Sequence, residues 1–158
     1  MTTAEAIPLF EWLAADVPFS DTGLAALAAA LRSDDPALLG PHPARMWQAG
    51  WDLVPPAHTA NPTDAVEAAS PLPFVGWKGR RLGNVASVLI WLRGLQERFD
   101  PETETTVPRH DRVRAVNGFV MWWERTHPDE SRPALLAAVG RVLAGDRVAA
   151  ETGRGVAR

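Results

Sequence analysis

The chain of 158 residues contains no cysteine, which excludes disulfide bonds, thiolate metal sites and cysteine nucleophiles. It also lacks tyrosine, and Lys78 is its only lysine. No apolar run approaches the roughly 20 residues that a membrane-spanning helix needs. The N-terminal sequence MTTAEA does not have the basic start of a secretory signal. We therefore expect a cytoplasmic protein with no membrane partner.

The composition that remains is that of an ordinary globular protein, with 46% hydrophobic and 22% charged residues. The length fits one domain that buries its own core without disulfides or metals. Seven tryptophans are an unusual number. Large aromatic side chains dominate both cores and interfaces, so their number alone does not separate these two uses.

The net charge of −3 is distributed unevenly along the chain. Residues 1–77 carry nine acids and two arginines, a charge of −7, whereas residues 78–125 carry nine bases and six acids, a charge of +3. Residues 126–158 add a charge of +1. Such polarity can orient a protein towards a partner or a second copy. The alternative is that the two halves attract each other within one fold.

The segment 82–99 has the strongest helical pattern in the chain. At about 100° per residue, one face collects Val85, Val88, Leu92, Leu95 and Phe99. The run 88–92 is apolar on every side, and such a helix has to be buried on more than one side. We predict a central apolar helix over 82–99, although a buried strand at 85–91 is an alternative reading of the same run.

Shorter helical patterns surround this segment and complete the predicted fold. Proline or capping signals begin them at Pro8, Ser20, Pro43, Asn61, Pro108 and Pro133. We predict an all-α fold, a compact single-domain bundle of about five to seven helices. The domain spans 1–150 and includes an irregular, proline-rich connection at 55–79; the acidic segment after the central helix forms a solvated loop, and 151–158 is a disordered tail.

Two of the predicted helices carry unusual residues on the faces opposite their core stripes. These residues are Ile90 and Gly94 in the first helix, and Arg114, Gly118, Met121, Trp122 and Arg125 in the second. Glycine inside a helix costs about 1 kcal/mol relative to alanine, so another backbone is expected to pack closely there. It belongs either to an alanine-rich helix of the same chain or to a partner that uses Trp122 as its aromatic anchor, with arginines at the rim.

A second hypothesis places a small-molecule site beside a pair of tryptophans. Trp47 and Trp51 are four residues apart and therefore lie on one helical face, with Arg45 and Asp52 as the nearby charged groups. Helical domains form binding sites between helices, with apolar walls and a few polar groups. In this reading the proline-rich connection covers the site; in the other, the tryptophans are core residues.

A third hypothesis is nucleic-acid binding through the basic region. Lys78, Arg80 and Arg81 precede the central helix, and Arg109 and Arg112 lie at the start of the helix that follows it. An antiparallel pair of helices would hold these two groups at opposite ends. Phosphate binding favours one contiguous basic surface, and the sequence pI of the chain is 5.8, so we rank this hypothesis below the others.

Catalytic and metal-binding motifs are not found in the sequence. There is no G-x-S-x-G motif and no glycine-rich phosphate loop. Glu124 and His127 have the spacing of a di-iron motif, but such a site needs a second pair of the same kind. We expect no metal and no cofactor, assign no catalytic residues and leave enzymatic activity open. The leading hypothesis is a non-enzymatic binding or regulatory protein that self-associates or joins a larger assembly.

Overall fold

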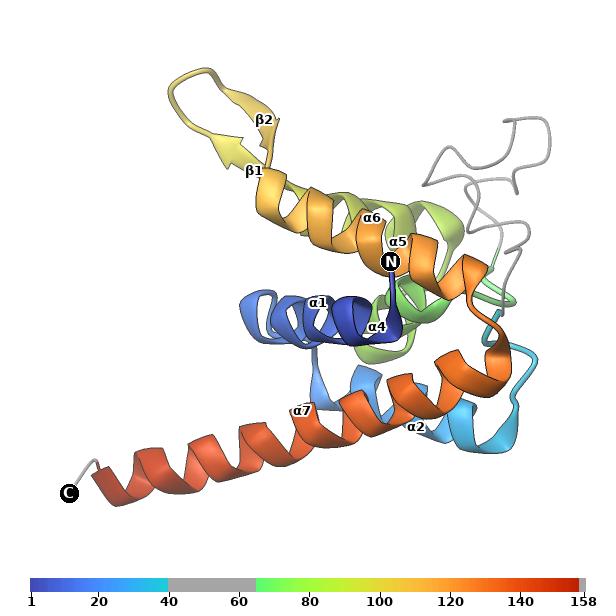
Figure 1. Ribbon diagram of the computed structural model, residues 1–158. Coiled ribbons are helices and arrows are strands. Elements are labelled where there is room, and N and C mark those ends of the chain that lie inside the picture. The colour runs from blue at the N-terminus through green and yellow to red at the C-terminus, as the bar shows by residue number, and fades with distance from the viewer. Residues whose placement is uncertain (40–64, 157–158) are drawn as a thin grey trace.

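The computed structural model describes residues 1–39 and 65–156. This part of the chain forms six helices and one β-hairpin, shown in Figure 1. In chain order the elements are α1 (Thr3–Asp16), α2 (Asp21–Ser33), α4 (Pro71–Arg80), α5 (Val85–Gln96), β1 (Glu97–Asp100), β2 (Thr105–Pro108), α6 (His110–Arg125) and α7 (Pro128–Val156). The predicted helical bundle is confirmed, with the hairpin as an element that the all-α prediction did not include.

The helices pack in three layers (Figure 1). α5 and α6 form one outer layer, α1 and α4 lie in the middle, and α2 and α7 form the other outer layer. α1 contacts α6 on one side and α7 on the other, while α4 contacts α5 and α2 in the same way. The middle layer is therefore the centre of the fold, and α5, predicted as the central helix, lies on the outside.

Aromatic side chains fill the space between the layers. Phe10 of α1 contacts Phe119 of α6 with ring centroids 5.4 Å apart, and Phe119 in turn contacts Trp122. The indole N–H of Trp123 donates to the carbonyl oxygen of Leu39 over 3.1 Å. Because that bond joins α6 to the chain segment after α2, the aromatic cluster ties together parts that are far apart in the sequence.

The first helix begins earlier than its proline suggested. Thr2 caps α1 by accepting from the backbone N–H of Glu5, and the Glu5 carboxylate accepts from the backbone N–H of Thr2 at 2.7 Å. This reciprocal capping box satisfies free donors at the helix start, so α1 begins at Thr3 and Pro8 lies inside it on the exposed side. The bond from the Thr2 backbone lowers the pKa of Glu5 below 4.5. Because the pKa of Glu5 is depressed, the bond from the Thr2 backbone to its carboxylate stabilises the fold fully above pH 4.5. This stabilisation is lost as the pH falls through the lowered pKa of Glu5.

Glycines let α2 and α4 approach closely. A Cβ atom at Gly23 of α2 would overlap the carbonyl oxygen of Val75 in α4, and one at Gly79 would overlap the Ser20 hydroxyl. Ser20 caps α2 as predicted, because its hydroxyl accepts from the backbone N–H of Gly23 at 3.1 Å. The close contact between α2 and α4 therefore requires a residue without a side chain at position 23.

The helix predicted at 82–99 is present but shorter. Its buried stripe is Val85, Val88, Leu92 and Leu95, as the spacing indicated. α5 begins after the Asn84 cap and ends at Gln96, so Leu82 and Phe99 lie outside it. Phe99 is in β1, and Ile90 is 71% exposed. The prediction of burial on more than one side is therefore wrong for Ile90, because no helix in the described part of the chain covers that face of α5.

The predicted irregular segments also contain regular structure. Residues 71–79 of the supposed connection belong to α4; Pro71 and Pro73 are tolerated because both lie in its first turn, where no backbone N–H is needed for the helix. The supposed solvated loop forms the turn and the second strand of the β1–β2 hairpin, and residues 97–99 of β1 come from the end of the predicted central helix. α7 continues through Gly145 to Val156, so residues 151–156 of the predicted tail are helical. No helix in residues 1–39 and 65–156 is long and apolar enough to cross a membrane.

Candidate functional site

The predicted interface residues divide into a buried group and an exposed group. Trp122 is only 1% exposed, and its indole N–H donates to the Thr3 hydroxyl of α1 at 3.0 Å. A Cβ atom at Gly118 would meet Leu9 and Met1. The close neighbour of Gly118 is therefore α1 of the same chain, and the prediction that Trp122 is an exposed interface anchor is wrong.

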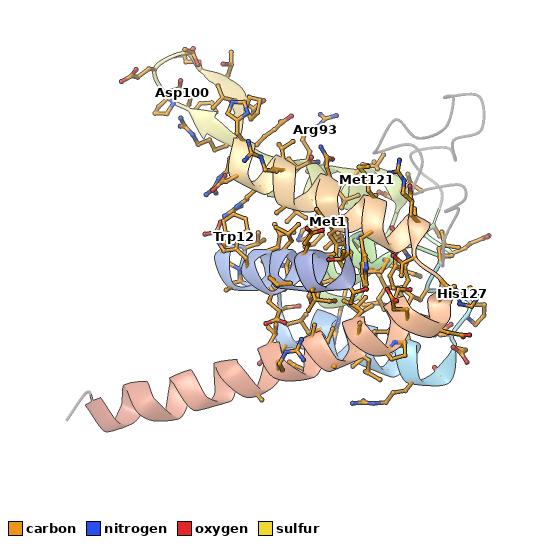
Figure 2. All side chains as sticks on the ribbon, in the orientation of Figure 1. Met1, Trp12, Arg93, Asp100, Met121 and His127 are labelled. Atoms are coloured by element: carbon orange, nitrogen blue, oxygen red, sulfur yellow. The ribbon has the colours of Figure 1, made fainter. Side chains whose placement is uncertain are left out.

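The other predicted interface residues lie on the outside of the α5–α6 layer. Gly94 of α5 and Arg114, Met121 and Arg125 of α6 are all exposed, as Ile90 is; Arg93, which was not predicted for the interface, is exposed beside Gly94. Since α4 and α1 lie beneath α5 and α6, these exposed residues face away from the middle layer. We call this surface the outer α5–α6 face; Figure 2 labels Arg93 and Met121 on it.

This face has an apolar and basic character. Met121 is 44% exposed, and the 62% exposed side chain of Met1 lies against Gly118 beside it. Met1, Gly118, Met121, Trp122 and Arg125 line a cavity of about 80 Å³. A Cβ atom added at Gly94 would meet no other atom of the described residues within 4 Å, so a second backbone can approach α5 there. Within the described part of the chain, Arg93 and Arg114 have no ion-pair partner.

The basic residues predicted for nucleic acid fall into two groups. Arg109 and Arg112 both face Asp16 of α1; the Nε atom of Arg112 lies 2.8 Å from its carboxylate, and Arg112 is nearly buried. Lys78 lies over the Trp77 ring at 4.0 Å, and Arg81 ends α4. Arg80, which belongs with Lys78 and Arg81, lines a cavity with Val17 and Phe19, directly after Asp16, so the structure does not keep all members of the two groups at opposite ends of α5. Arg112 is committed to a contact within the chain.

Other ion pairs explain part of the charge asymmetry in the sequence. Glu11 of α1 pairs with Arg141 of α7 at 2.7 Å, and Asp34 after α2 pairs with Arg132 at 3.4 Å. With the contact from Asp16 to Arg112, acids of the N-terminal half neutralise bases of the C-terminal half. These pairs favour attraction within one fold as the explanation of the asymmetry.

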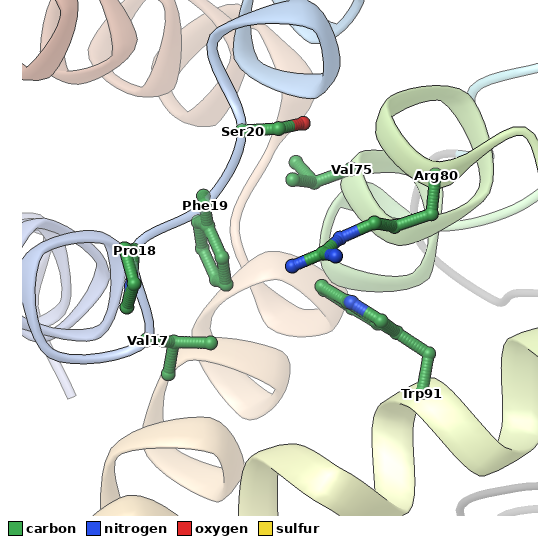
Figure 3. A pocket seen from close by; sticks show the side chains of 7 residues that line it. All are labelled: Val17, Pro18, Phe19, Ser20, Val75, Arg80 and Trp91. Atoms are coloured by element: carbon green, nitrogen blue, oxygen red, sulfur yellow. The ribbon is translucent and has the colours of Figure 1, made fainter.

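Arg80 lines a small cavity between α4, α5 and the turn after α1 (Figure 3). Its guanidinium lies beside the Trp91 indole and points towards Phe19, with Ser20 and Val75 behind. A Cβ atom at Gly76 would overlap the Trp91 ring, so α4 packs directly against this indole. The cavity volume is about 20 Å³, which is enough for a single water molecule. It is too small for a substrate.

A larger groove lies where the end of α2 meets the start of α7. It has a volume of about 550 Å³, and its lining residues are Leu31, Asp34, Pro128, Asp129, Arg132, Pro133 and Leu136. This volume is within the range of small-molecule sites. Its polar groups are two carboxylates and one guanidinium, without a hydroxyl or thiol nucleophile. The sequence analysis did not identify this groove because each of its residues has a capping or packing role in its own helix.

The remaining predicted sites are a ligand pocket and a metal-binding motif. Arg45, Trp47, Trp51 and Asp52, the predicted ligand pocket, lie outside the residues that the structure describes. Within the described residues, no three His, Asp or Glu side chains are placed to hold a metal ion. The exposed His127 instead accepts from the backbone N–H of Asp129 through Nδ1 at 3.1 Å. Comparisons with protein-family models, curated proteins and solved structures found no match for this chain.

Proposed function

We propose that this chain is a non-enzymatic binding or regulatory domain that works through protein contacts on the outer α5–α6 face. The observation that carries the proposal is where the exposed apolar side chains lie. The described part of the chain has five large hydrophobic residues that are exposed, Met1, Trp12, Ile90, Phe99 and Met121. Three of them lie on or beside this face, and Phe99 follows α5 in the hairpin; Trp12 alone lies on α1.

The chemistry of the face suits a protein partner. Interface centres are enriched in methionine, aromatic residues and arginine and contain few other charges. Met121 and Ile90 supply the apolar part, and Arg93, Arg114 and Arg125 supply donors that an acidic or carbonyl-rich partner would satisfy. Gly94 leaves room for a close approach. The cytoplasm is the location that we propose for this function, on the composition of the sequence.

A charge placed on this face tests the proposal. Ile90→Arg and Met121→Arg are expected to leave the free energy of unfolding within about 0.5 kcal/mol of wild type, because both side chains are already exposed. Each is expected to weaken partner binding at least tenfold, because the guanidinium replaces an apolar contact and is buried against the apolar part of the partner surface, which costs about 2 kcal/mol or more. The control is Ala137→Arg, which adds the same charge at an exposed position of α7, in the opposite layer.

The measurement has two steps. Proteins that co-purify with wild type are identified by mass spectrometry. Each is then purified and titrated against the four chains by calorimetry. Equal affinity for wild type and both face variants would show that the partner does not bind through the outer α5–α6 face. Loss of binding only with Ala137→Arg would move the contact to the α2–α7 layer.

A further inference from the structure

The β1–β2 hairpin has an unpaired strand edge. β1 and β2 are antiparallel, with Arg98 opposite Val107 and Phe99 opposite Thr106. Two residues before Arg98, the backbone N–H of Arg109 donates to the carbonyl oxygen of Gln96 at 2.6 Å. In an antiparallel ladder every second residue pair exchanges hydrogen bonds, so Arg98 and Asp100 bond to β2. Glu97 and Phe99 therefore direct their backbone N–H and C=O groups away from β2.

Nothing in the described part of the chain covers this edge. The sheet has only two strands there, and the hairpin projects beyond the ends of α5 and α6 (Figure 1). Phe99 is 62% exposed. The outer edge of β2 is a poorer place for another strand, because Pro108 has no N–H to donate. A two-stranded hairpin with little apolar cover is marginally stable in water, so pairing along β1 would stabilise it.

We propose that two copies of this chain pair through β1, antiparallel about a two-fold axis at Phe99, and so form a four-stranded sheet. In this register the Phe99 backbone groups of the two copies bond to each other, which satisfies the outward-facing N–H and C=O of Phe99. The two Phe99 side chains lie next to each other on one face of the sheet. On the other face, Arg98 of each copy lies opposite Asp100 of the second copy.

Charge complementarity selects this register over its neighbour. A two-fold axis at Arg98 would also satisfy the outward-facing groups, by pairing Glu97 with Phe99. It would place Arg98 directly opposite Arg98 of the second copy, however, and like charges in that position are destabilising. Arg98 is exposed and has no acidic partner in residues 1–39 and 65–145. The Asp100 carboxylate accepts from the backbone N–H of Glu102 at 3.0 Å and from the Thr103 hydroxyl at 3.2 Å, and it has no basic partner in the described part of the chain.

The proposed contact between the two β1 strands is small, so the dimer is expected to be weak. Two strands of four residues bury less than the roughly 1,200 Å² of a stable interface, so the dimer is expected to depend on protein concentration. It uses residues outside the outer α5–α6 face and does not require the proposed function. If the dimer forms and the outer α5–α6 face binds a partner, one dimer carries two such faces. A partner with two matching sites then binds with higher overall affinity, because its second site binds at a high effective concentration.

The test uses light scattering across a concentration series up to about 1 mM, where weak complexes are populated. Wild type is expected to pass from the monomer mass of 17.1 kDa towards twice that value. Arg98→Asp places two carboxylates opposite each other and is expected to remain a monomer throughout. Arg98→Lys keeps the charge and is expected to dimerise as wild type does. A wild type that stays a monomer over the whole series overturns the proposal.

Single cysteines test the register, because the chain has no other thiol. Phe99→Cys places two thiols at the two-fold axis, where Cα atoms of a bonded antiparallel pair are about 5.5 Å apart, within the reach of a disulfide. It is expected to form a covalent dimer under mild oxidation. Thr106→Cys, on β2 beside Phe99, is the control, because the two Thr106 positions are about three strand spacings of about 4.8 Å apart. Crosslinking of Thr106→Cys at the same rate as Phe99→Cys would overturn this pairing even if wild type dimerises.

Discussion

Replacing Trp122 by alanine is expected to lower the free energy of unfolding by about 3–5 kcal/mol, the range for large aromatic residues removed from a core. The side chain is 1% exposed and contacts the rings of Phe119 and Trp123. Its loss opens a cavity between α6 and α1 and leaves the Thr3 hydroxyl without the indole N–H. Urea unfolding followed by circular dichroism measures the change.

The matched control for this substitution is the next residue along the chain. Met121 lies beside Trp122 on α6 but is exposed, so Met121→Ala is expected to cost less than about 1 kcal/mol. Trp122→Phe should fall between the two, because it keeps most of the apolar volume and loses the hydrogen bond. A cost for Trp122→Ala as small as that of Met121→Ala would show that this tryptophan is not packed between α1 and α6.

Gly23→Ala is expected to destabilise the fold by about 1–3 kcal/mol, as overpacking does in other cores. The added methyl group would overlap the Val75 carbonyl oxygen, and a backbone atom does not move aside as a side chain does. The helix propensity of alanine returns about 1 kcal/mol, so the observed cost is a net value. Thermal unfolding should show a midpoint lowered by about 2–4 °C for each kcal/mol.

The opposite result is expected for Gly94, a second glycine inside a helix. Gly94 also lies within a helix, but no atom of the other described elements lies within 4 Å of the position that its Cβ would take. Gly94→Ala is therefore expected to stabilise the protein by about 0.5–1 kcal/mol through helix propensity alone. The same sign for Gly23→Ala and Gly94→Ala would contradict the close approach of α2 and α4.

The helices could be predicted from the sequence because their buried residues follow helical spacing. Leu24, Leu27 and Leu31 of α2 are all buried, as are Val116, Val120 and Trp123 of α6. Periodicity gives the face that is buried but not the neighbour that buries it. For this reason α5 was expected at the centre, whereas the pairing of layers places α1 and α4 there.

The errors at the ends of elements have a local cause. Pro71 and Pro73 indicate a loop when they are read alone, but a first helical turn tolerates both. The segment 97–108 is short and acidic, and its pairing depends on a turn in which Asp100 accepts from the Glu102 backbone and the Thr103 hydroxyl. No apolar alternation indicated strands there, because both faces of the hairpin are largely exposed.

The candidate site could be predicted only in part. The sequence indicated that Ile90, Gly94 and Met121 share the second faces of two long helices, and the structure leaves these residues exposed. It also suggested two neighbours for Gly118 and Trp122, the alanine-rich second helix or a partner chain, and the packing gives a third, α1 of the same chain. Neither α1 nor its N-terminal Met1 could be identified as that neighbour from spacing, because tertiary contacts between distant segments leave no periodic signal.

Amide hydrogen exchange, read by mass spectrometry with and without the purified partner, tests the outer α5–α6 face most directly. We expect slower exchange on partner binding in Val85–Gln96 and His110–Arg125, and unchanged exchange in α2 and in the first turns of α7. Slower exchange confined to the groove between Leu31 and Leu136, with α5 and α6 unaffected, would contradict the proposed contact surface and favour a site between α2 and α7.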